Sequence, residues 1–193
     1  MKIFAVGRNY ADHAKEMNSP VPTEPVIFMK PAEALLKPGQ PFTYPPFSKD
    51  IHYEAELVLR VGKRLPFDAI SVGIDFTARD LQAKQKEKGL PWEIAKSFNG
   101  SAACGEFVVV KKLSQDNPLR FWMTKNGEIC QAGDTSQMLF TFETILDYLK
   151  QFFTLEPGDL VFTGTPSGVG PVNIGDYYEG FLEGARVMDC LIG

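Results

Sequence analysis

Two glutamates that lie two residues apart, Glu54 and Glu56, have the clearest potential for chemistry in this sequence. The mostly apolar, β-branched segment that follows them, residues 57–61, is typical of a strand. Because side chains alternate across a strand, His52, Glu54 and Glu56 are expected on one face. Adjacent carboxylates repel each other unless a cation lies between them, and Mg²⁺ and Mn²⁺ prefer such oxygen ligands. The segment alone fits either a metal site or the solvated face of an edge strand.

Asp75 could supply a third carboxylate to the same site. It lies within the apolar segment 72–76, which resembles a strand and is followed by a helix-like segment. A Glu–Glu–Asp set suits one octahedral cation, with the remaining positions left for water and substrate. Taken alone, however, Asp75 more often accepts hydrogen bonds from turn amides, and Gln82 in the following helix more often faces solvent.

His13 and Glu16 form a second candidate pair. They are three residues apart, so on a helix they meet on one face. A carboxylate beside an imidazole orients the ring and raises its basicity, which is the arrangement of a general base. The alternative, favoured when the pair is taken alone, is a surface ion pair on a short helix.

Lys96 is flanked by apolar residues in the segment 94–98. A lysine in such a place can point into a cleft and stabilise an oxyanion or an enolate. Most lysines are simply solvated, so this segment predicts little by itself.

The glycine-rich segment 163–170, which contains Thr165, follows the short apolar run 160–162. Glycine-rich loops after strands expose amides that can hold a carboxylate or a phosphate. The segment lacks the Gly-Lys-Ser/Thr ending of a nucleotide-binding P-loop. An ordinary tight turn remains the simpler interpretation.

Many short strands and a few helices are expected to position these residues. The pair Asn126-Gly127 predicts a type I′ hairpin turn. Apolar residues at 145, 146, 149, 152 and 153 predict a helix over 142–153 that packs on the core, and shorter helices are expected over 78–87 and around 10–17. The fold class is therefore a β-rich α+β domain, with strands expected over 2–6, 26–29, 52–61, 72–76, 106–111, 119–124, 128–131, 160–164, 177–182 and 185–191.

Composition narrows the possible classes of protein. With 193 residues, 44% of them hydrophobic, and a net charge of −4, the chain fits one globular domain. The only dense basic run, residues 84–88, is interrupted by polar and acidic residues, so we expect no nucleic-acid binding. No apolar run approaches the ~20 residues that span a bilayer, so we expect no membrane partner.

Two features bear on the compartment. The three cysteines, Cys104, Cys130 and Cys190, are odd in number and far apart, which favours buried thiols in a reducing compartment over disulfides or a zinc site. The apolar run near the N-terminus, residues 3–7, is too short for a signal-peptide core. We therefore expect a cytoplasmic protein.

Taken together and in order, these segments resemble the fumarylacetoacetate hydrolase family over nearly the whole chain. Each motif is weak alone, but their joint order and spacing are specific. The matching pieces are Gly7-Arg8-Asn9-Tyr10 with His13 and Glu16, Lys30-Pro31, His52-x-Glu54-x-Glu56-Leu57, Asp75-x-Thr77-Ala78-Arg79-Asp80-Leu81-Gln82, Lys96-Ser97-Phe98, Asn126-Gly127-Glu128, Leu155-Glu156-Pro157-Gly158-Asp159 and Thr163-Gly164-Thr165-Pro166-x-Gly168-Val169-Gly170.

The resemblance implies a mixed β-sandwich roll, formed by one catalytic domain over residues 1–193 and usually assembled as a homodimer. It also implies that Glu54, Glu56 and Asp75 hold Mg²⁺ or Mn²⁺ at the mouth of the roll. One departure is the short connection from Leu57 to Ile74, where many relatives have a longer one.

The resemblance further implies roles toward a 2-keto or 2-enol acid substrate. Gln82 and Lys96 would contact its oxygens, and Thr165 would bind its carboxylate. His13 and Glu16 correspond to the catalytic dyad on an N-terminal lid, here residues 8–20, in the branch that contains acylpyruvate hydrolases and oxaloacetate decarboxylases.

The activity expected from this resemblance is hydrolysis of a C–C bond in a 2,4-diketo acid of the acylpyruvate or fumarylpyruvate type. His13, oriented by Glu16, would activate water, and Lys96 would stabilise the pyruvate enolate that leaves. The same site could instead serve a 2-hydroxyhepta-2,4-diene-1,7-dioate isomerase or an oxaloacetate decarboxylase. A non-catalytic, metal-stabilised binding domain is a third alternative, against which the dyad and Lys96 argue.

Overall fold

The computed structural model describes residues 1–64, 66–109, 111 and 118–193, and within them the chain forms three β-sheets and four α-helices. The largest sheet has seven strands in the order β2-β1-β11-β4-β5-β7, with β8 also pairing with β5. Strands β1 and β11 are parallel, and the other pairs in this sheet are antiparallel. Its strands are β1 (Ile3–Gly7), β2 (Val26–Lys30), β4 (Ala55–Val61), β5 (Phe67–Asp75), β7 (Ala102–Cys104), β8 (Val108–Val109) and β11 (Leu160–Phe162).

The second sheet is antiparallel, with the order β10-β9-β13-β14, and a small third sheet has the order β12-β3-β6. Asn126 and Gly127 join β9 to β10 with φ angles of 53° and 87°, which confirms the predicted type I′ turn. The strands of these sheets are β3 (Ile51–Tyr53), β6 (Thr77–Ala78), β9 (Arg120–Lys125), β10 (Glu128–Asp134), β12 (Gly170–Pro171), β13 (Tyr177–Leu182) and β14 (Ala185–Leu191).

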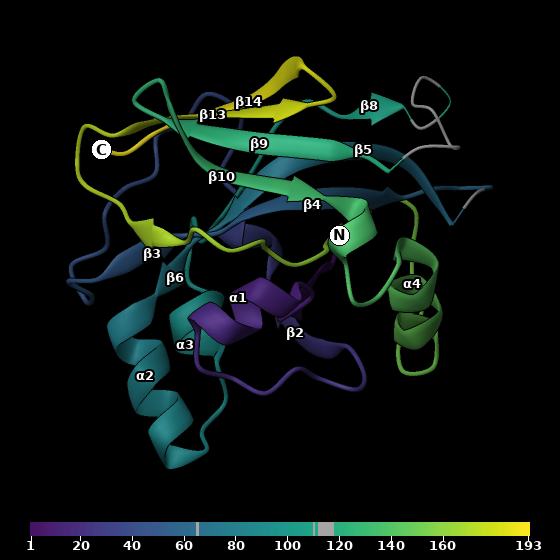
Figure 1. Cartoon of the computed structure of the whole chain (residues 1–193), viewed down its shortest axis with the longest axis horizontal. Coiled ribbons are helices and arrows are strands. Elements are labelled where there is room, and N and C mark those ends of the chain that lie inside the picture. Colours follow the sequence, from purple (N-terminus) through teal and green to yellow (C-terminus); the bar gives the residue numbers. More distant parts are fainter. Residues whose placement is uncertain (65, 110, 112–117) are drawn as a thin grey trace.

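The core lies between the seven-stranded and the four-stranded sheets. Leu57 and Val72 of the first sheet are fully buried in one cluster with Phe121 and Tyr178 of the second. In Figure 1 β9, β13 and β14 lie on one side of β4 and β5. This arrangement confirms the predicted β-rich α+β class and the mixed β-sandwich.

The helices are α1 (Ala11–Glu16), α2 (Arg79–Lys88), α3 (Glu93–Lys96) and α4 (Phe142–Lys150), with 3₁₀ turns at Ala32–Ala34 and Thr135–Gln137. Figure 1 shows α1, α2 and α3 gathered on the side of the sandwich away from β13 and β14. Helix α4 buries Ile145, Leu146 and Leu149 as expected, but it ends at Lys150 and leaves Phe152 62% exposed. The prediction that Phe152 packs on the core was therefore wrong.

The predicted strand 52–61 is divided at Glu54 between two sheets. Residues 51–53 pair with β6 and β12, whereas residues 55–61 pair with β5 and β11. The side-chain amide oxygen of Gln131 accepts a hydrogen bond from the Ala55 N–H at 2.8 Å, which satisfies a donor beside the break. Because of this break, His52 turns away from the glutamates and pairs with Asp50 at 2.9 Å.

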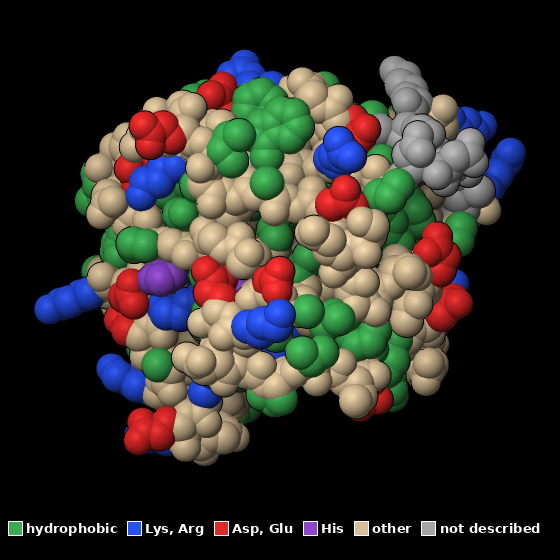
Figure 2. Space-filling view, viewed as in Figure 1, with side chains coloured by type: hydrophobic (Ala, Val, Ile, Leu, Met, Phe, Trp, Pro, Cys, Tyr) green, Lys and Arg blue, Asp and Glu red, His purple; other side chains and the backbone are tan. Residues whose placement is uncertain are grey.

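The part of the predicted strand 106–111 that the structure describes is reduced to Val108–Val109, and residue 110 lies outside the described residues. The three cysteines are free thiols, but only Cys190 is buried as expected, and Cys104 and Cys130 are half-buried. Acidic and basic side chains are interspersed on the face shown in Figure 2. Among the described helices, none is both long and apolar enough to cross a bilayer.

Candidate metal centre

Three buried carboxylates converge where the seven-stranded and three-stranded sheets meet. Glu54 lies at the break between β3 and β4, Glu56 lies in β4, and Asp75 is the last residue of β5. They are 5%, 1% and 1% exposed. Each offers one oxygen that lies within 4.8 Å of an oxygen from each of the others. The antiparallel pairing of β4 with β5, which continues as a hydrogen bond from the Asp75 N–H to the Glu54 carbonyl, brings them together.

Lys96, at the end of α3, lies between two of these carboxylates. Its ammonium nitrogen is 2.7 Å from Glu54 Oε2 and 2.8 Å from Asp75 Oδ2. The guanidinium of Arg79, at the start of α2, binds the other Glu54 oxygen at 2.8 Å. Sequence reasoning singled out Lys96 but gave Arg79 no role, although Arg79 belonged to a matching motif.

Lys30 is a further buried cation, to which sequence reasoning gave no role although Lys30-Pro31 belonged to the matching motifs. Its ammonium nitrogen lies 2.7 Å from Asp75 Oδ1, and its side chain is fully buried. It also donates hydrogen bonds to the Lys96 carbonyl and to the carbonyl and hydroxyl oxygens of Ser101. The available signal was a lysine that directly follows four apolar residues, 26–29, in a predicted strand. Lys30 therefore ties three segments of the centre together.

Burial and charge act in opposite directions on the pKa values of this centre. Burial would raise the pKa of Glu54, but Lys96 and Arg79 outweigh it and hold that pKa below its usual range. Burial would lower the pKa of Lys96, but attraction to Asp75 and Glu54 outweighs it and raises that pKa. Lys96 is therefore an ammonium ion at neutral pH.

Glu56 is the least compensated carboxylate of the three. Burial and the nearby charges of Asp75 and Glu54 raise its pKa well above the usual range. Its only hydrogen-bond donor among the described residues is the Gly164 N–H, at 2.7 Å. Asp75 also keeps an open position, because its Oδ1 contacts Lys30 as an ion pair yet has no aligned hydrogen-bond donor. Buried carboxylate oxygens with open lone pairs fit a hard divalent cation.

Two glycines of the loop after β11 donate backbone N–H groups to acidic side chains. Gly164 has a φ of 99° and donates to Glu56, and Gly168 has a φ of 101° and donates to Glu16. A side chain at either position would be strained, and a Cβ on Gly164 would lie 2.6 Å from the Asn9 Cβ. The loop amides that were expected to hold a ligand carboxylate or phosphate thus hold carboxylates of the protein itself.

Helix α1 brings the His13–Glu16 pair over the same cavity. The His13 Nδ1 lies 3.1 Å from Glu16 Oε2, and the His13 side chain is only 7% exposed. The Gly168 N–H lies 3.1 and 3.3 Å from the two Glu16 oxygens. Glu16 therefore links the imidazole to the glycine-rich loop, which is more than a surface ion pair would do.

Gln82 and Thr165 also line this cavity, as expected. The Gln82 side-chain oxygen accepts from Arg79 at 2.8 Å. The Thr165 hydroxyl accepts from the Gln131 side-chain amide at 2.9 Å. Gln131, 2% exposed, thereby positions both Thr165 and the strand break at Ala55, and sequence reasoning missed it.

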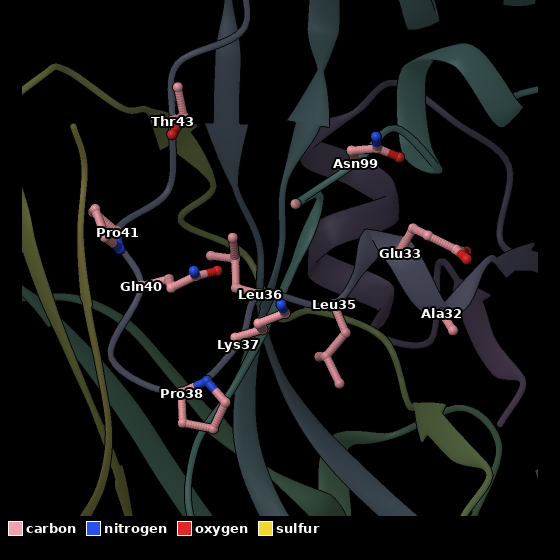
Figure 3. Close-up of a pocket in the computed structure, with 11 residues that line it drawn as sticks. Ala32, Glu33, Leu35, Leu36, Lys37, Pro38, Gln40, Pro41, Thr43 and Asn99 are labelled. Atoms are coloured by element: carbon pink, nitrogen blue, oxygen red, sulfur yellow. The ribbon is translucent and has the colours of Figure 1, made fainter.

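The free space at this centre is small, about 30 Å³. That is room for about two water molecules. A more spacious hollow of about 860 Å³ lies elsewhere, along the segment 32–43 with Asn99 and Gly100 across from it (Figure 3). Its only acidic or basic lining residues are Glu33 and Lys37. The smaller cavity, which is lined by the three carboxylates and by His13, is the candidate site.

Comparison with known proteins shows that the chain is similar to enzymes. Residues 2–190 match the family described as fumarylacetoacetate (FAA) hydrolase C-terminal. The chain is 44% identical over 196 residues to "Oxaloacetate tautomerase FAHD1, mitochondrial" of Mus musculus, which covers 96% of this chain and 89% of the relative. It is 40% identical over 194 residues to "Oxaloacetate decarboxylase, mitochondrial" of Dictyostelium discoideum, which covers 95% of this chain and 89% of the relative.

A solved structure is similar over the whole chain. It is fumarylpyruvate hydrolase from Pseudomonas aeruginosa, in complex with Mn²⁺ and pyruvate. The TM-score is 0.91 at 36% sequence identity, and the match covers 100% of this chain and 89% of that one.

Proposed function

The chain belongs to the fumarylacetoacetate hydrolase family, and from this premise we propose that it is a divalent-metal-dependent enzyme acting on small 2-oxo acids and their 2-enols. The reaction that we propose first is interconversion of the enol and keto forms of oxaloacetate. The observation that carries this proposal is the Lys96 ammonium held between Glu54 and Asp75. It sets a fixed positive charge beside the carboxylates that would hold the metal, where a 2-oxygen would gain negative charge.

A divalent cation held by Glu54, Glu56 and Asp75 would supply a Lewis acid that binds and polarises the 1-carboxylate and 2-oxo oxygens of the substrate. The Lys96 ammonium lies 2.7 Å from Glu54 and 2.8 Å from Asp75, so it would donate a hydrogen bond to the 2-oxygen beside the metal. The Thr165 hydroxyl lines the same cavity and would bind the substrate carboxylate.

In tautomerisation the 2-hydroxyl oxygen loses a proton and C3 gains one, while C2=C3 becomes a single bond and C2–O becomes a double bond. His13 would carry the proton to C3, because it lines the cavity and its ring contacts Glu16. The lid, residues 8–20, would exclude water from the enolate while the proton moves.

The second candidate is hydrolysis of a 2,4-diketo acid, which the position of the dyad favours. His13 would take a proton from water as the hydroxyl oxygen bonds to C4. The C3–C4 bond then breaks, and its electron pair leaves with C3 as the enolate of pyruvate. Decarboxylation of oxaloacetate leaves the same enolate as CO₂ departs, so Lys96 would serve all three reactions.

We also propose that residues 1–193 form a single catalytic domain, that the protein is a homodimer, and that it is cytoplasmic. The relatives named above carry the word mitochondrial in their names, so the location needs its own measurement.

The test is to give the purified protein oxaloacetate and acetylpyruvate, each with Mg²⁺, Mn²⁺ or a chelator. Ultraviolet absorbance follows the enol, and a lactate dehydrogenase couple follows pyruvate release. We expect metal-dependent enol–keto conversion without equivalent pyruvate release from oxaloacetate. Pyruvate from acetylpyruvate would support the second candidate instead.

The variant K15Q controls for unspecific effects of substitutions in helix α1 on this activity. Lys15 lies on the same helix as the dyad, but its side chain is 74% exposed and pairs with Asp12. K15Q should keep full activity. If the metal-bound protein turns over neither substrate, the proposed function is wrong.

A further inference from the structure

Two cations lie close to one indole ring at the candidate site. The guanidinium carbon of Arg8 lies 6.0 Å from the ring centroid of Trp92, and the ammonium of Lys86 lies 5.7 Å from it. All three residues line the same cavity as Glu54 and Asp75. Trp92 precedes α3 and Lys86 lies in α2, so three separate segments build this group, which we call the rim cluster (Arg8, Lys86 and Trp92).

The rim cluster has no acidic partner of its own. Within residues 1–64, 66–109, 111 and 118–193, no salt bridge and no side-chain hydrogen bond involves Arg8 or Lys86. By contrast, Lys30, Lys96 and Arg79 each bind a carboxylate of the centre. The site therefore has two more positive charges than its own acidic groups balance, before any metal binds.

The Lys86 side chain is exposed along the helix. Partial desolvation of its ammonium end and then repulsion by Arg8, Arg79 and Lys96 still lower its pKa. An anion placed among these cations would remove that repulsion.

The backbone gives an independent reason to look at Arg8. Its φ is 63°, in the left-handed region that glycine adopts without strain. Strained residues of this kind persist where the side chain or the turn has a task. A glycine would adopt this φ without strain, so an arginine here is in keeping with a role for its side chain.

We propose that Arg8 and Lys86 bind a second carboxylate of the substrate, at the end away from the carboxylate held beside the metal. Trp92 holds the two cations in place and covers the carbon chain between the two ends. The natural substrate is then a dicarboxylic 2-oxo acid, and acylpyruvates with an apolar end are poor substrates. This inference rests on the proposed function, which it makes more specific.

The test compares pyruvate, which has one carboxylate, with 3,3-difluoro-oxaloacetate, which has a second carboxylate on a CF₂ carbon and cannot form an enol. The decisive readout is how the ratio of the two affinities changes in the variants below. Binding to the Mg²⁺-loaded protein is followed by the fluorescence of Trp92 in a W122F background, since the chain has only two tryptophans, and independently by calorimetry. We expect the dicarboxylate to bind at least about tenfold more tightly than pyruvate.

The variants R8Q and K86Q should each weaken binding of the dicarboxylate by about tenfold and leave pyruvate binding unchanged. The matched control is K84Q, because Lys84 is an exposed lysine on the same helix that does not line the cavity. It should change neither affinity. R8G should lose its preference for the dicarboxylate, whereas its melting temperature should rise because glycine relieves the strained φ. If Arg8 had only a structural role, the substitution would not lower this preference.

Two outcomes would overturn the inference, and they are distinguishable. If pyruvate and the dicarboxylate bind but R8Q and K86Q keep the wild-type ratio, the second-carboxylate site is wrong and the proposed function stands. If neither ligand binds to the Mg²⁺-loaded protein, the proposed function fails as well.

Discussion

Asp159 and Asp176 are buried carboxylates like those of the candidate metal centre, but different groups donate hydrogen bonds to them. Asp159 is 1% exposed and accepts the backbone N–H of Lys2 at 2.7 Å and that of Glu156 at 2.9 Å. The Lys2 ammonium adds an ion pair at 3.0 Å. Backbone donors are held by the fold, so this carboxylate has a fixed environment.

Asp176 follows the same pattern before β13. It accepts the Asn173 N–H at 2.6 Å and the Asn126 side-chain amide at 3.0 Å, and the Lys125 ammonium lies 2.9 Å away. Its carboxylate fastens the loop before β13 to the β9–β10 hairpin. Its role is therefore structural.

The metal centre has the opposite balance. Its three carboxylates are crowded together, yet among the described residues only Glu56 accepts a backbone N–H, from Gly164. The other contacts come from the side-chain cations Lys30, Lys96 and Arg79. The comparison teaches that buried carboxylates with fixed backbone donors hold the fold, whereas those balanced by side-chain cations can exchange partners for an ion or a substrate.

The largest expected effect follows from removing a cation from each kind of site. K30M should destabilise the metal-free protein by about 3 kcal/mol, because it removes one of the two ammonium groups that balance the buried Asp75 carboxylate, and only Lys96 remains. K2M should change stability little, since Asp159 keeps its two backbone donors. Urea unfolding measures both.

A second measurement sharpens the K30M result. Saturating Mg²⁺ should restore part of the lost stability, because the ion supplies the missing positive charge. Equal losses in K30M and K2M would show that the distinction between the two kinds of site is false.

Glu16 is a carboxylate that has both a backbone donor and a side-chain partner that can gain a positive charge. It accepts a fixed donor, the Gly168 N–H, and it also contacts His13, yet it is 33% exposed. If its task is to orient the general base, E16Q should lower turnover by about 100-fold or more while Mg²⁺ affinity stays unchanged. Kinetics and calorimetry on the same preparation check this. An E16Q variant with full activity would exclude the dyad from the mechanism.

Strand alternation alone left the role of Glu54, Glu56 and Asp75 open, and the resemblance carried by the ordered motifs predicted that they form one site. The structure does bring the three carboxylates together. The sequence did not reveal Lys30 as part of the centre. Its burial depends on contacts with Lys96 and Ser101, which lie 66 and 71 residues away in the chain. The identity of a residue carries no record of such long-range packing.

The break at Glu54 was hidden for a similar reason. Residues 52–61 read as one continuous strand, and only pairing with two different sheets divides them. The end of α4 at Lys150 was also unpredictable from periodicity, since Phe152 continues the apolar pattern but points to solvent. The hydrophobic pattern of a segment predicts whether a helix or a strand forms there. Where that helix or strand ends depends on tertiary contacts.

Metal binding gives the next prediction. At a Mg²⁺ concentration about 100 times its dissociation constant, the free energy of unfolding should rise by about 2.7 kcal/mol. E56Q should lose most of this gain, because the amide that replaces Glu56 carries no charge to hold the ion. D176N should keep the gain, although its starting stability is lower. Chemical unfolding with and without Mg²⁺ measures it, and a full gain in E56Q would remove Glu56 from the ligand set.

The smallest expected effect concerns Asp159 in acid. Burial alone would raise its pKa, but the backbone N–H groups of Lys2 and Glu156 outweigh it and lower the pKa. A carboxyl with a lowered pKa in the folded state stabilises the protein above its unfolded pKa, and this contribution is lost as the pH falls through the folded pKa. D159N should therefore cost about 1–2 kcal/mol at about pH 7 and progressively less below about pH 4. Unfolding of both proteins across this range measures the difference, with D12N as an exposed control. If the difference in unfolding free energy between the wild type and D159N does not change with pH, the charge of Asp159 does not contribute to stability.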